Sequence, residues 1–256
     1  MNGAASAAVG EQLVFRFRGR GGARAGAGRK PRAERVGLLP HAPRARHRRY
    51  EPVHVTARAV RSSPNLRSQS AFGALRAVFA RSSEKGFRLL HFSVQGNHVH
   101  FIAEADDGMA FARGVQRLLS RAAMAVNALA RRSGKLWVDR HHREPLTTPN
   151  QVRNAYVYVL FNLRKHELAS PAPSTSAMTA VDGCSSTFWF EGWSPRAPLP
   201  PETIAAGGPA IVASPTTWLA RRGWKTRGLL RLDEIPRARP ANSARTATAT
   251  RVARSA

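Results

Sequence analysis

The hydrophobic positions between residues 51 and 168 repeat with the periods of strands and helices. Four short stretches alternate or cluster their apolar residues in the manner of β-strands, and three longer ones space them three and four positions apart, as on one face of a helix. In chain order, these elements are expected at "VHVTARAV", "SQSAFGALRAVFARS", "FRLLHFSVQ", "HVHFIAEA", the segment from "ADDG" to Gly134, "KLWVDRHH" and the segment that starts at Pro149.

The order of these elements predicts an α+β fold. Strand, helix, strand, strand, helix, strand is the ferredoxin-like split βαβ plan (β-α-β-β-α-β), here with one added helix at the end. The dipeptide Gly96-Asn97 suits a tight hairpin between the second and third strands. We therefore expect one antiparallel sheet that is covered by helices.

Composition divides the chain into three parts. Residues 1–50 carry 12 Lys and Arg against 2 acidic residues and have few apolar positions, so a disordered basic arm is expected. Residues 51–168 form the expected folded domain. Residues 169–256 are rich in Pro, Ser, Thr, Ala and Gly, and predict an irregular tail. Its aromatic segments, "FWFEGW" and "TWLARRGW", are expected to dock onto the domain or, less often, to stack on bases.

Charge narrows the class of partner. The formal net charge is +26 and the excess is almost all arginine, which suits forked contacts to phosphate, so nucleic acid is the expected partner. Within the arm, Arg29, Lys30 and Arg32 are candidates for DNA phosphate or minor-groove contacts. The single cysteine, Cys184, excludes an internal disulfide. No apolar run reaches the roughly 18 to 20 residues of a membrane span, so a cytoplasmic protein without membrane contact is expected.

Two histidines of the third expected strand point the same way. Side chains alternate across a strand, so His98 and His100 share one face while Val99 and Phe101 face the hydrophobic side. For an isolated His-x-His pattern, two surface histidines are the commoner explanation. The pair gains interest only if other reactive side chains converge on the same face.

The last expected helix carries such side chains. Thr148, Pro149 and Gln151 have the spacing of a capping box with proline at the first helical position. A helical wheel places Tyr156 on the apolar face and Tyr158 on a separate polar arc. Tyr158 is a candidate nucleophile, and a solvated helix face is the alternative. The remaining members of the polar arc are Gln151, Asn154, Asn162, a candidate metal ligand, and Lys165, a candidate phosphate contact.

Taken together, "GNHVHFI", the ferredoxin-like order and "YVLFNLRKH" resemble the HUH single-strand tyrosine transposases, most closely those associated with bacterial repetitive extragenic palindromes. The resemblance implies that His98, His100 and Asn162 bind a divalent metal, Mg²⁺ or Mn²⁺, and that Tyr158 is the nucleophile. It also implies a bacterial, nucleoid-associated enzyme that cuts and rejoins single-stranded or hairpin DNA through a 5′-phosphotyrosine. "DRHHREPL" departs from the family by placing His141 where an aromatic residue is common.

Two other interpretations stay open. A basic DNA- or RNA-binding protein could keep this fold without catalysis, and a zinc-binding protein could use four histidines, His98, His100, His141 and His142. His142 is otherwise a candidate phosphate contact or an ordinary exposed loop residue. A homodimer is possible. No chemistry is assigned to the remaining histidines, which are His41, His47, His54, His91 and His166; of these, His91 is expected to face out of its strand.

Overall fold

The structure is a computed structural model, and it describes residues 47–164 and 181–236. Its sheet has four strands, in the spatial order β2-β3-β1-β4, and every neighbouring pair is antiparallel. The elements follow the chain order β1-α1-β2-β3-α2-β4, which is the order of the split βαβ plan. The prediction of an α+β fold is therefore confirmed. The strands are β1 (Val53–Arg58), β2 (Phe87–Val94), β3 (His98–Ala105) and β4 (His142–Pro145).

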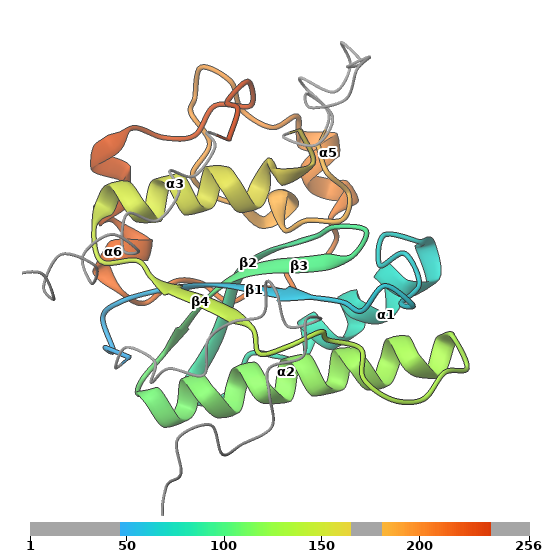
Figure 1. The fold of residues 1–256 in the computed structure, drawn as a ribbon. Helices are drawn as coiled ribbons and strands as arrows, with labels where there is room; N and C mark the ends of the chain where they lie inside the picture. Colours follow the sequence, from blue (N-terminus) through green and yellow to red (C-terminus); the bar gives the residue numbers. More distant parts are fainter. Residues whose placement is uncertain (1–46, 165–180, 237–256) are drawn as a thin grey trace, which may run out of the picture. The chain divides into compact units, whose positions relative to one another are not determined.

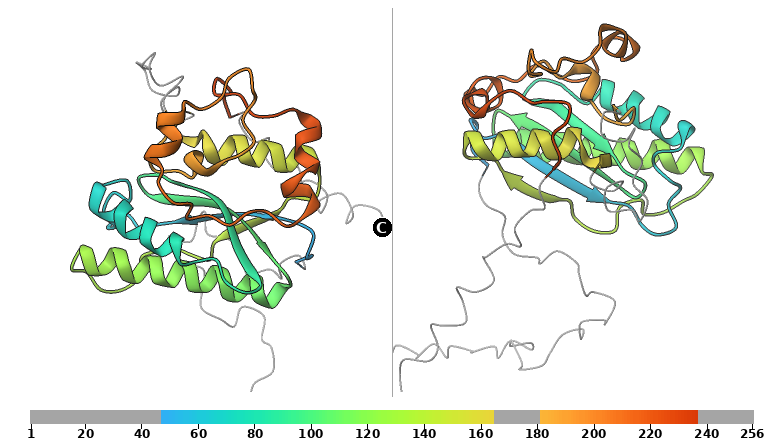
Figure 2. Two further views of the ribbon diagram at one scale, coloured as in Figure 1. Left: turned by 180° about the vertical axis from the view of Figure 1, so that it is seen from behind. Right: turned by 90° about the horizontal axis from the view of Figure 1, so that it is seen from above.

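Helices cover both faces of this sheet (Figures 1 and 2). Helices α1 (Gln69–Ala80) and α2 (Gly108–Leu129) lie on one face, whereas α3 (Pro149–Leu160) and the C-terminal segments lie on the other. Strand alternation divides the core accordingly, because odd and even positions of β3 enter different hydrophobic clusters. Val99, Phe101 and Ala103 pack with α1 and α2, and Ile102 packs with α3.

Each of the three main helices begins at a residue whose side chain caps its first turn. Ser68, Asp107 and Thr148 accept hydrogen bonds from backbone N–H groups that would otherwise have no partner inside the helix. At α3 the full capping box forms, since the Gln151 side chain accepts from the Thr148 backbone N–H in return. The predicted start of this helix is thus confirmed.

Two expected boundaries are wrong. The strand expected at "KLWVDRHH" is instead β4, which starts at His142, the last residue of that stretch; Trp137 makes only an isolated bridge to Ala59. The Trp137 indole N–H donates to the Leu119 carbonyl of α2 at 2.9 Å, so this stretch packs on a helix. Helix α2 ends at Leu129 and not at Gly134, because Arg131 adopts a left-handed backbone conformation (φ 46°) that breaks the helix.

The C-terminal segment, residues 181–236, packs over α3 and the sheet through short elements and partly buried ion pairs. Arg67 binds the Asp182 carboxylate with both guanidinium nitrogens, at 2.8 and 3.1 Å, and Arg153 does the same to Glu234, at 2.7 and 2.9 Å. Within the described ranges, no helix is long and apolar enough to span a bilayer. The short elements are η3 (Thr187–Trp189), α5 (Pro201–Ala206), α6 (Trp218–Arg221) and η4 (Gly223–Arg227).

Candidate functional site

A row of polar side chains crosses the sheet on the face that α3 covers. In the register of the strands, His100 of β3 lies opposite Thr56 of β1, and Thr56 lies opposite His142 of β4. Directly opposed residues present their side chains on the same face, at a Cβ separation of about 4.5 to 5.5 Å. The next pair along β1 and β3 is Arg58 opposite His98. The two histidines of the His-x-His pattern are therefore surrounded by polar groups.

Each of these two histidines is held at its Nδ1 atom. His98 Nδ1 lies 2.8 Å from the Asn97 side-chain oxygen, which can only accept, so the imidazole donates from Nδ1 and carries its lone pair on Nε2. His100 Nδ1 lies 2.9 Å from the Thr56 hydroxyl, which can accept in the same way. The two rings approach edge to face, with centroids 4.7 Å apart. Holding one ring nitrogen so that the other faces a ligand is the usual support of a metal-binding histidine.

Tyr158 of α3 lies against this pair. Its ring meets His100 edge to face, with a centroid distance of 5.1 Å and an interplanar angle of 89°. The side chain is partly exposed, and its burial raises the pKa of the hydroxyl above the ordinary value. The hydroxyl is consequently protonated at neutral pH.

The neighbouring tyrosine of α3 points elsewhere. Tyr156 is 1% exposed, and its hydroxyl donates to the Ala220 carbonyl at 3.0 Å. Burial, together with the charge of Glu104, raises the pKa of this hydroxyl far above its ordinary value. The separation of a core tyrosine from a site-facing tyrosine follows the helical wheel, since two positions on a helix differ by about 200°.

Asn162 lies one turn beyond Tyr158 and is fully buried. Within residues 47–164 and 181–236, neither its amide oxygen nor its amide nitrogen has a hydrogen-bond partner. Leaving a buried amide without partners costs about 1 to 3 kcal/mol, so such a group in a folded protein calls for an explanation. One explanation is that the amide oxygen is a ligand for a cation.

The donor set can be tested against a divalent metal. Two imidazoles with held Nδ1 atoms and one amide oxygen without a partner fit such an ion, with His98, His100 and Asn162 as the residues that would hold it. In the described part of the chain, no group of three or more His, Cys, Asp or Glu side chains is arranged to bind a metal. The described residues thus show no site in which His98, His100, His141 and His142 are gathered around one metal ion.

Comparisons with known proteins add little at the level of sequence. No protein-family model matches the chain, and no curated protein does. A solved structure is similar. It is described as "Structure of the REP associates tyrosine transposase bound to a REP hairpin", is 15% identical, and is covered over 93% of its length by 70% of this chain, at a TM-score of 0.46. A likeness at this level does not assign the chain to a family.

Three side chains beside the site were not predicted from the sequence to belong to it. His54 is 7% exposed, and its ring lies 5.4 Å from that of His100 and 5.7 Å from that of Tyr158, measured between centroids. Thr56 orients His100, and Arg58 brings a cation opposite His98. The alternation of "HVTAR" puts these three residues on one face of β1, but only the pairing of β1 with β3 shows what they face.

The structure places the other histidines of the sequence analysis as follows. His142 is partly buried at the start of β4. His91, expected to face out of its strand, is instead 6% exposed, because a bulge in β2 between Leu89 and His91 turns it into the core that α3 covers. The candidate phosphate contacts that lie outside the described residues are Lys165, Arg29, Lys30 and Arg32.

Proposed function

We propose that this protein is a metal-dependent transposase or nickase that cuts and rejoins single-stranded DNA through Tyr158. The contact that best supports the proposal is the one between the Tyr158 ring and His100, at a centroid distance of 5.1 Å. A tyrosine hydroxyl is a known type of covalent nucleophile, and it requires an electrophile held within reach. In this proposal, the imidazole pair and the Asn162 amide would hold a cation, which would hold a phosphate beside the hydroxyl.

Each residue of the site has its own role in the proposed reaction. A divalent ion held by His98, His100 and Asn162 would act as a Lewis acid toward a non-bridging oxygen of the scissile phosphate. Arg58, opposite His98, would bind an adjoining phosphate. Because burial raises the pKa of the Tyr158 hydroxyl, the nucleophile enters the reaction with its proton.

In the proposed cleavage step, one bond to phosphorus forms as another breaks. The Tyr158 oxygen forms a bond to phosphorus while the bond from phosphorus to the 3′ oxygen breaks. The hydroxyl proton passes to solvent and the departing 3′ oxygen takes a proton from solvent, so a 5′-phosphotyrosine and a free 3′-hydroxyl result. A second 3′-hydroxyl can then reverse these steps and join two strands. Cutting and joining therefore need no external energy source.

The test is formation of a covalent complex. The full chain is incubated with labelled single-stranded hairpin oligonucleotides and Mn²⁺ or Mg²⁺, and a denaturing gel separates the protein–DNA adduct. Wild type and Tyr156→Phe should form the adduct, whereas Tyr158→Phe and samples with chelator should not. Tyr156→Phe is the matched control, because it deletes the same hydroxyl from the core at a cost of about 1 kcal/mol. DNA binding without an adduct under any metal would instead favour a catalytically inactive DNA-binding protein on the same fold.

A further inference from the structure

We infer that the segment Thr217–Arg227, which comprises α6 and η4, is a second contact for DNA that binds an unpaired stretch beside the strand to be cut. The inference deepens the proposed function and rests on it. Trp218 of this segment is 60% exposed, unusually so for an indole. Its neighbour Trp224 is 2% exposed and packs against Tyr156 and Phe190. One tryptophan thus fixes the segment to the core, and the other faces out.

The exposed indole is held in place by a glycine. A Cβ atom at Gly223 would lie only 2.6 to 3.0 Å from three carbon atoms of the Trp218 ring, so the ring lies directly on the backbone of Gly223. A ring supported on one side and open on the other offers a flat face at little entropic cost. Such rings are the platforms on which unpaired bases stack in proteins that bind single strands.

Positive charge is concentrated in the segment that carries this ring. Arg221 and Arg222 follow Trp218 by three and four positions, which places them next to it on the same turn. Lys225 and Arg227 follow in η4, all four cations are exposed, and no acidic residue occurs between Thr217 and Leu230. Among the described residues, none of the four forms an ion pair. An aromatic face within a cluster of available cations matches the base and phosphate of a nucleotide.

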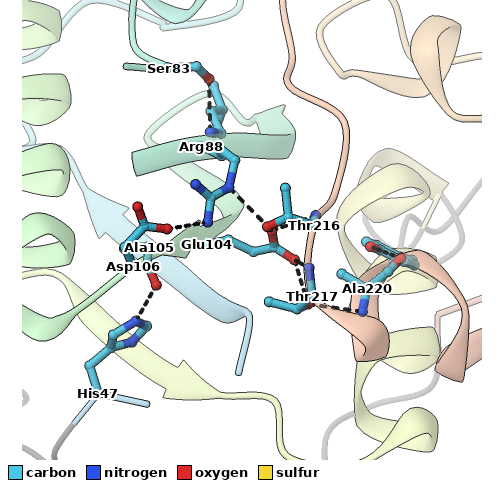
Figure 3. A network of polar contacts seen from close by, with 11 residues as sticks. His47, Ser83, Arg88, Glu104, Ala105, Asp106, Thr216, Thr217 and Ala220 are labelled. Atoms are coloured by element: carbon cyan, nitrogen blue, oxygen red, sulfur yellow. Dashed lines mark hydrogen bonds and ion pairs between the residues drawn. The ribbon is translucent and has the colours of Figure 1, made fainter. Parts of the chain in front are cut away.

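The segment is fixed to the strand that carries the candidate site (Figure 3). Both carboxylate oxygens of Glu104 on β3 accept hydrogen bonds from Thr216 and Thr217, at 2.5 to 3.0 Å. Glu104 and His100 share one face of β3 and are four residues, or about 13 Å, apart. About four nucleotides at most are needed to cover that distance, since the rise in duplex DNA is roughly 3.4 Å per nucleotide and an unpaired strand extends further. A hairpin with a short single-stranded flank can therefore reach both places.

Fluorescence anisotropy with a labelled hairpin that carries a single-stranded flank tests the inference on the full chain. Trp218→Ala should weaken binding roughly tenfold at every salt concentration, which is the loss expected for one stacked base. Gly223→Ala, which displaces the ring without changing charge, should weaken binding in the same direction. Arg221→Gln with Arg222→Gln should lower the slope of log affinity against log salt by about 1.4, or about 0.7 for each lost phosphate contact.

The matched control is Arg113→Gln with Arg121→Gln, two exposed arginines of α2 on the other face of the sheet. This pair removes the same charge and should leave the affinity unchanged. Binding by Trp218→Ala within twofold of wild type, or an equal loss in the α2 pair, overturns the inference. Tighter, Trp218-dependent binding of an RNA of the same sequence overturns DNA as the partner. Failure of the proposed function is seen separately, as the absence of an adduct with wild type.

Discussion

Glu104 offers a sharp test of how the C-terminal segment is held on the sheet. The residue is fully buried, and it accepts four hydrogen bonds from Thr216 and Thr217 while Arg88 lies 3.5 Å away as its counter-ion (Figure 3). Glu104→Gln keeps the size of the side chain but replaces one accepting oxygen by an NH₂ group. That group would face two donors, so two charge-assisted hydrogen bonds are lost.

The magnitude follows from this geometry. Hydrogen bonds to a charged group contribute roughly 1.5 to 3 kcal/mol each, and breaking a buried ion pair on one side costs about 3 to 5 kcal/mol. These figures overlap, so Glu104→Gln should lower the free energy of unfolding by about 3 to 5 kcal/mol. The control is the second carboxylate that pairs with Arg88. This is Asp106, which lies 3.0 Å from Arg88 and whose side chain is 47% exposed. Asp106→Asn should cost at most about 1 kcal/mol.

Urea unfolding followed by circular dichroism measures both variants on the full chain. Limited proteolysis adds a local readout, since loss of the Glu104 contacts should speed cleavage near Thr216 before the sheet unfolds. If Glu104→Gln lies within 1 kcal/mol of Asp106→Asn and cleavage is not accelerated, the four hydrogen bonds do not hold the segment and the argument is refuted.

Three further predictions concern single side chains. Burial lowers the pKa of His91 to about 3, so the unfolded chain binds this proton first on acidification; urea titrations should show wild type losing about 1.6 kcal/mol more than His91→Gln between pH 6.5 and 5. Asn162→Leu should raise the unfolding free energy in chelator by about 1 kcal/mol, since it removes the buried amide, while Mn²⁺ should raise the melting temperature of wild type only. Arg58→Gln should reduce the salt slope of single-strand binding by about 0.7 and change stability by less than 0.5 kcal/mol.

Local signals in the sequence were sufficient where a structure depends on neighbours along the chain. The capping box at Thr148 and the different arcs of Tyr156 and Tyr158 depend on spacing within one helix, and both appear in the structure. The strand expected at "KLWVDRHH" was misplaced because Trp137 packs on α2, a tertiary contact that no local pattern reveals. His91 was misjudged for a similar reason, since a single bulge residue changes the face on which the following side chain lies.

The residues around the histidine pair could not be predicted without the order of the strands in the sheet. His54 and Thr56 precede His100 by more than forty residues, and they meet it only because β1 lies next to β3 in the sheet. A sequence pattern gives the face of each residue within its own strand but not the neighbouring strand. The burial of Asn162 was equally hidden, since a polar residue on a polar arc is normally expected to face solvent.

The orientation of Tyr158 depends on residues far from it along the chain. Tyr156 is enclosed by His91 of β2 and by Phe190 and Trp224 of the C-terminal segment, with ring centroids 5.1 to 5.5 Å away. These ring contacts, which a phenylalanine at position 156 would keep, fix the rotation of α3 about its axis. Because Tyr158 is two positions further on the same helix, that rotation also sets the angle at which its ring meets His100. The C-terminal segment is therefore part of the machinery that aims the proposed nucleophile, although it contributes no atom to the histidine pair.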